Sequence, residues 1–121
     1  MRRVLTFAFV LATASCAPPA CSETSERAAR QDIKLLVEDE GPLAEAARAR
    51  LVARGGQAIA VIETGLYAAN PPARLRIVRT LAEIGARETL PILEHLAAHD
   101  PDPGVRAAAQ RAKEQAISAH P

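Results

Sequence analysis

The stretch that decides the fold runs from Pro72 to Gly85 and reads PARLRIVRTLAEIG. Its aliphatic residues recur three and four positions apart, which is the spacing of one face of an α-helix. Proline is tolerated in the first helical turn, and glycine suits the left-handed position just after a helix. The stretch therefore predicts a helix over 72–84. Its inward residues are expected to be Leu75, Val78, Leu81 and Ala82, with Ile77 and Ile84 widening the face.

Proline and glycine recur along the chain with a period of about thirty residues. Pro42 and Pro72 are thirty positions apart, Pro103 follows thirty-one later, and Gly55 precedes Gly85 by thirty. Self-similarity with a fixed period of this length is typical of a solenoid built from supersecondary units. Each period therefore predicts one pair of helices.

The remaining helices follow from similar patterns. Pro91 is tolerable only in a first turn, so a helix is expected from about Glu88 to Ala98. The last helix is expected to begin with Asp102 as its N-cap and Pro103 at its first position. A leading helix is expected over 25–38. The inward residues of the first hairpin are predicted to be Leu43, Ala47, Leu51, Ile59, Ile62, Leu66 and Ala69.

The composition indicates one all-α domain. The chain has 121 residues, of which 49% are hydrophobic but only 2% aromatic. Most apolar residues are Ala and Leu, which rank high in helix propensity, and runs of β-branched residues are absent. The net charge of +1 becomes −1 when Arg2 and Arg3 leave with a cleaved leader. Without a basic excess or aromatic platforms, the chain is not expected to bind nucleic acid.

Several segments together resemble HEAT repeats of the bacterial type also found in phycobilin lyases: Leu81-Ala82-Glu83-Ile84-Gly85, Leu90-Pro91-Ile92-Leu93 and Asp102-Pro103-Gly104-Val105-Arg106. The resemblance is close over 70–112 and looser over 41–69. It implies a short right-handed α-hairpin (HEAT-like) solenoid of about two and a half repeats over 25–118. It also implies that Asp102 and Arg106, with Arg76 at the matching position thirty residues earlier, help to tie neighbouring repeats together.

The N-terminus has the layout of an export signal. Met1-Arg2-Arg3 is a short basic region, and the run Val4–Ala14 is mainly apolar and is followed by small residues. The run is too short for a permanent transmembrane helix. We therefore expect a signal peptide over 1–15; the alternative is a buried N-terminal helix of the domain.

Two cleavage sites compete in this segment. The residues that end at Cys16 resemble a bacterial lipobox, in which Cys16 becomes the lipid-modified first residue. The resemblance implies a lipid anchor in the periplasm, with the outer membrane favoured over the inner, and a flexible tether over 16–24. Cleavage after Ala14 would instead give a soluble periplasmic or secreted protein. Without acylation, Cys16 and Cys21 could close as a disulfide.

No arrangement of residues indicates catalysis, so the protein is expected not to be an enzyme and to need no cofactor. His95 and His99 lie four positions apart on a predicted helix, but no third ligand has suitable spacing. No metal site is therefore expected, and both histidines are interpreted as solvated. A bilin-lyase-like enzyme remains the alternative, and it is disfavoured because export separates the chain from pigment assembly in the cytoplasm.

The expected function is a protein-interaction or scaffolding module tethered in the bacterial cell envelope, or alternatively a self-associating structural lipoprotein. Tyr67, Arg74, Arg76 and Arg79 are the candidate partner-binding residues, because tyrosine and arginine are enriched at binding hot spots. The alternative is partial burial of Tyr67 and pairing of the arginines with nearby glutamates. The partner is expected to be an unidentified envelope protein or a second copy of the chain.

The last helix carries a narrow stripe of small residues and has no partner helix after it. Either the preceding hairpin covers the whole stripe, or another chain completes the stack. We expect the partner to dock at this end, around 107–117. The stripe consists of Val105, Ala108, Ala109, Ala112 and Ala116.

Overall fold

The computed structural model describes residues 18–120, which form helices and turns without any strand. The α-helices are α1 (Pro18–Glu38), α2 (Pro42–Arg54), α3 (Ile59–Leu66), α4 (Pro71–Ile84), α5 (Leu90–His99) and α6 (Pro103–Ala119). Short 3-10 turns, η1 (Gly55–Ala58) and η2 (Arg87–Thr89), lead into α3 and α5. The predicted all-α solenoid of helical hairpins is confirmed.

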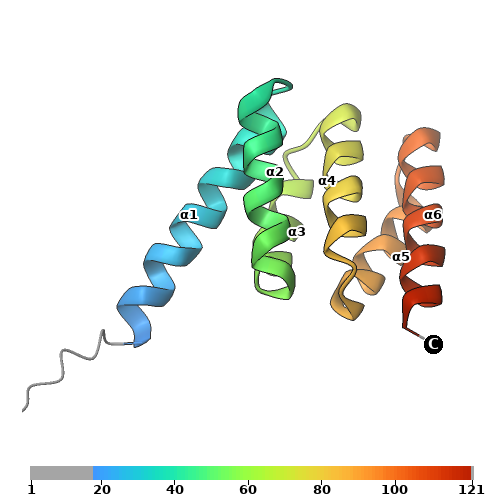
Figure 1. Cartoon of the computed structure of the whole chain (residues 1–121). Coiled ribbons are helices and arrows are strands. Elements are labelled where there is room, and N and C mark those ends of the chain that lie inside the picture. Colours follow the sequence, from blue (N-terminus) through green and yellow to red (C-terminus); the bar gives the residue numbers. More distant parts are fainter. Residues whose placement is uncertain (1–17, 121) are drawn as a thin grey trace, which may run out of the picture.

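The helices are arranged in two layers. Figure 1 shows α2, α4 and α6 side by side as one row, with α3 and α5 behind it. The leading helix α1 packs against α2, α3 and α4, so it covers the N-terminal end of the stack. The last helix α6 packs against α4 and α5 at the other end. The molecule is thus two hairpins, α2–α3 and α4–α5, between two single helices.

The ends of α4 and α6 lie where local chemistry requires them. The side chain of Asn70 accepts a hydrogen bond from the backbone N–H of Ala73 at 3.0 Å, and prolines occupy the first turn of α4. Gly85 ends that helix with φ +63°, in the left-handed region that favours glycine. The side chain of Asp102 accepts from the N–H of Val105 at 3.0 Å at the start of α6. The predicted N-cap of α6 is therefore confirmed.

The core follows most of the predicted inward faces, with two corrections. Leu75 is 37% exposed and Leu43 is 58% exposed, so both predictions of burial were wrong. The buried face of α4 instead runs along Ala73, Ile77 and Leu81, which are spaced four apart. Leu75 lies two positions from Ile77, which places it on the opposite side of a helix with 3.6 residues per turn.

The leading helix is longer than expected. It begins at Pro18 rather than near residue 25, so residues 18–24 are helical where the sequence predicted part of a flexible tether. The reason is that Pro18 and Pro19 occupy the first turn, where proline is tolerated, instead of breaking a helix interior. Residues 1–17 lie outside the described part of the chain, and with them the predicted signal peptide and Cys16.

The first part of α1 extends beyond the packed body. Figure 1 shows α1 slanting away from the row of helices toward its N-terminus. Residues 23–28 are exposed, and Ala29 is the first buried residue of the helix. The buried face of α1 therefore begins at Ala29, and before it Arg54 at the end of α2 donates to the carbonyl and hydroxyl oxygens of Ser25 at 3.1 and 2.8 Å.

Gly65 marks the closest approach between α1 and α3. A Cβ atom at this position would lie 2.6 Å from Cγ2 of Ile33, which is a steric overlap. Gly→Ala in a helix interior ordinarily stabilises by about 1 kcal/mol. Gly65→Ala is expected instead to lower the free energy of unfolding by about 1–2 kcal/mol, because the helices must move apart.

Gly56 provides the matched control for this prediction. A Cβ atom at Gly56 would meet only the Glu88 carboxylate, at 4.0 Å. Gly56→Ala is therefore expected to leave stability within about 0.5 kcal/mol of the parent. Urea denaturation of both variants measures the difference. Equal midpoints for the two variants would contradict the close contact.

Candidate functional site

Arg76 joins the second hairpin to the leading helix. Its Nε donates to the carbonyl oxygen of Leu36 at 2.9 Å, and Nη2 donates to that of Val37 at 3.1 Å. The last carbonyl groups of a helix have no partner within the helix, so a guanidinium group at the end of α1 satisfies them. Arg76 also lies 3.6 Å from the carboxylate of Glu40. The side chain is thus directed at the protein's own backbone.

Arg74 joins the start of α4 to the turn between α5 and α6. Its Nε and Nη2 donate to the two carboxylate oxygens of Asp100 at 2.8 and 3.1 Å. Its Nη1 donates to the carbonyl oxygen of Ala69 at 2.8 Å. The Asp100 side chain is only 2% exposed and that of Arg74 is 15% exposed. Arg74 therefore has an internal role, and its binding of a partner stays a prediction.

The aspartate that pairs with α4 is Asp100, in the turn between α5 and α6, and the sequence did not single it out. Asp102, which the resemblance to HEAT repeats implied, caps α6 instead. Arg106 donates to the carbonyl oxygens of Asp100 and Pro101 at 2.6 and 3.2 Å, so it holds the turn before its own helix. Asp100 accepts a further hydrogen bond from the N–H of Asp102 at 2.9 Å. The signal for this role was a second aspartate shortly before Pro103.

Arg79 is exposed on α4, on the side that carries a network of charges shared with α2. Arg48 donates to Glu45 at 2.7 Å and also forms an ion pair with Glu83 across the two helices. The hydrogen bond from Arg48, and then its charge, lower the pKa of Glu45, and the charge of Arg79 contributes a smaller effect. Of the three predicted arginines, Arg79 alone extends into solvent in the described part of the chain.

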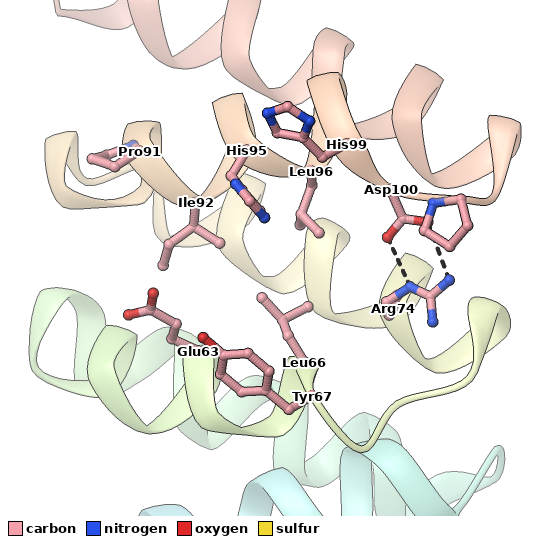
Figure 2. Close-up of a pocket in the computed structure, with 11 residues that line it drawn as sticks. Glu63, Leu66, Tyr67, Arg74, Pro91, Ile92, His95, Leu96, His99 and Asp100 are labelled. Atoms are coloured by element: carbon pink, nitrogen blue, oxygen red, sulfur yellow. Dashed lines mark hydrogen bonds and ion pairs between the residues drawn. The ribbon is translucent and has the colours of Figure 1, made fainter.

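A groove of about 450 Å³ lies between α3 and α5. Figure 2 shows Leu66 on α3 and Leu96 on α5 facing each other across it. The Arg74–Asp100 pair closes one end. Its lining residues are Glu63, Leu66, Tyr67, Arg74, Pro91, Ile92, His95, Leu96, His99, Asp100 and Pro101. The groove brings Tyr67 and Arg74 together among the predicted binding residues, and leaves out Arg76 and Arg79.

Tyr67 is a highly exposed large side chain at the groove. It is 89% exposed, so the alternative of partial burial does not apply. Tyr67 follows α3 directly and keeps helical backbone angles, with φ −68° and ψ −28°. Glu63 therefore lies one helical turn before it on the same face. Figure 2 shows both side chains extending from α3 toward Ile92.

His95 and His99 line the other wall of the groove, on α5. Their ring centroids are 5.0 Å apart, with the rings tilted by 48°. Figure 2 shows His95 directed toward α3, whereas the ring of His99 turns away from it. Among residues 18–120, no group of three or more His, Cys, Asp or Glu side chains is placed to hold a metal ion.

The predicted docking end at α6 offers little apolar surface. Its inward stripe of Val105, Ala109, Ala112 and Ala116 is buried against the preceding helices, so the hairpin covers the stripe. On the outer face, only Ile117 is a large exposed hydrophobic residue, at 51%. A polar outer face is the property of a capping unit in a solenoid. The exposed polar residues of α6 are Gln110, Arg111, Glu114, Gln115 and Ser118.

None of the helices described in residues 18–120 combines the length and the apolar character needed to cross a bilayer.

Comparison with known proteins identifies the family of the chain. Neither a curated protein nor a solved structure matches the chain. A family of HEAT repeats matches residues 33–113, which span both hairpins and most of α6. The chain therefore belongs to the HEAT repeat family.

Proposed function

We propose that the protein is a non-catalytic protein-interaction module that binds its partner in the groove between α3 and α5. HEAT repeats commonly act as scaffolds for protein–protein contacts, which supports the general function. The groove is the single observation that carries the more specific proposal. The prominent arginines Arg74, Arg76 and Arg106 bind the protein's own carboxylates and carbonyl groups.

The groove suits a segment of protein better than an enclosed small molecule. Pockets for small ligands usually bury about 70–90% of the ligand surface. Here Tyr67 is 89% exposed and Pro91 is also exposed, so one side of the groove is open. An exposed tyrosine beside buried aliphatic residues is typical of a binding hot spot with a hydrophobic centre. A side chain of a partner can therefore enter while the partner's backbone runs along the surface.

Photo-crosslinking in the native cell tests this proposal. The full chain would carry a photoreactive phenylalanine analogue at Tyr67 or, as a control, at Arg111 on the outer face of α6. We expect position 67 to crosslink a specific protein, and position 111 not to crosslink it. The same crosslinked protein from both positions, or none from position 67, would rule out the groove as the binding surface. A product of twice the chain's mass from position 67 would favour the self-associating alternative.

We further propose that the module is exported and anchored to a membrane through lipid on Cys16. The basic, apolar and small residues over 1–15 support this location. Cys16→Ser is expected to move the protein from the membrane fraction to the soluble fraction or to leave it unprocessed. The matched control Cys21→Ser should remain membrane-bound and processed. Unchanged fractionation and processing of the Cys16→Ser variant would refute the anchor.

A further inference from the structure

We infer that the groove takes a partner segment in which a cationic side chain stands next to one or two aliphatic side chains. This inference rests on the proposed function, because it specifies the chemistry of the partner for the same groove. Two parts of the groove carry it. The floor between α3 and α5 is aliphatic, and the edge formed by α3 combines a carboxylate with an aromatic ring.

The aliphatic floor limits how much of a partner can enter. Leu66, Ile92 and Leu96 form it, and the last two are only 8% and 7% exposed. The packing of the two hairpins holds these side chains in place, so the floor is preformed. A groove of about 450 Å³ accommodates a few side chains and not a whole helix. One or two aliphatic residues of the partner would fill it and release water from apolar surface.

The edge on α3 favours a cation. Glu63 is exposed, and among residues 18–120 no hydrogen bond or ion pair involves its carboxylate. Tyr67 lies one turn further on, so its ring and the carboxylate stand side by side at the groove. Aromatic faces attract Lys and Arg side chains, and a carboxylate adds a charge-assisted hydrogen bond. A cation placed between them would satisfy both.

The other charges of the groove do not change this preference. Arg74 and Asp100 neutralise each other through two hydrogen bonds at the closed end. The pair therefore leaves Glu63 as the unpaired fixed charge in the groove's lining. A partner segment with its own carboxylate at the edge would meet Glu63 directly, and that contact is unfavourable.

A random peptide library tests the inference without knowledge of the natural partner. The full chain, immobilised through a C-terminal tag in mild detergent, is panned against phage that display random dodecapeptides. We expect enriched peptides to carry Lys or Arg within four positions of Leu, Ile, Val or Met. Binding of a synthetic peptide of the enriched sequence is then measured by fluorescence anisotropy. Glu63→Gln and Tyr67→Ala are each expected to weaken it about five- to tenfold.

The matched control is Glu94→Gln, an exposed carboxylate on α5 outside the groove's lining. It should leave peptide affinity unchanged, and far-UV circular dichroism should show equal helicity for all three variants. Failure to enrich peptides, enrichment of acidic or uncharged ones, or affinity insensitive to Glu63→Gln would overturn the inference. Light scattering gives a further test. If the parent protein is a dimer and both Glu63→Gln and Tyr67→Ala make it monomeric, the groove is occupied by a second copy of the chain, and the inference is overturned. Crosslinking from Tyr67 to another protein would still uphold the interaction module when the charge preference fails.

Discussion

Arg74→Met is expected to lower the free energy of unfolding by about 3 kcal/mol, because it leaves the carboxylate of Asp100 buried without its cation. The Asp100 side chain is 2% exposed, and Arg74 supplies two of its hydrogen bonds. Arg74 also donates to the carbonyl oxygen of Ala69, so the substitution loosens two turns at once. Chemical denaturation of the full chain measures the loss.

Two further variants separate the buried pair from a general effect of removing an arginine. Arg79→Met removes an exposed arginine from the same helix and should change stability by less than about 0.5 kcal/mol. Asp100→Asn in the Arg74→Met background removes the unpaired charge, so part of the lost stability should return. A loss for Arg74→Met no greater than for Arg79→Met would show that the pair does not stabilise the contact between α4 and the turn after α5.

Leu81→Ala is expected to destabilise the protein by about 3 kcal/mol, since Leu81 is 0% exposed on the inward face of α4. The substitution removes apolar contacts and leaves a cavity between the hairpins. Small domains have about 5–15 kcal/mol of total stability, so the loss is a large fraction of the whole. The thermal midpoint and the urea midpoint should both fall by a large margin.

Leu75→Ala is the control on the same helix. Leu75 is 37% exposed and faces away from Ile77 and Leu81, so its truncation should cost less than about 1 kcal/mol. The two variants remove the same atoms from the same type of residue. Their difference therefore measures burial alone. Equal losses would mean that the inward face of α4 is misplaced.

The extent of the helices was open to prediction because the signals lie within a few residues of each end. Asp102 with Pro103 predicted the start of α6, and Gly85 predicted the end of α4. Pro18 misled the prediction for α1, because a proline has opposite effects in a first turn and in a helix interior. Only the position of the proline relative to the start of the helix decides which of these effects applies.

The candidate site was much less predictable than the helices. The sequence pointed to Tyr67, and the structure places it at the groove with 89% of its surface exposed. It also pointed to Arg74 and Arg76, whose side chains the structure directs to Asp100 and to the end of α1. The pattern of residues could not reveal this, because Arg76 lies forty positions from Leu36 in the chain.

The sequence by itself determined that the protein is a stack of helical hairpins with a period of about thirty residues. Backbone sterics and the hydrogen-bonding needs of helix ends act within one or two turns, so proline, glycine and capping residues suffice to encode them. Only the tertiary structure decided which side chains meet: the pairing of Arg74 with Asp100 and the groove between α3 and α5. These depend on how the two hairpins pack, which no local pattern specifies.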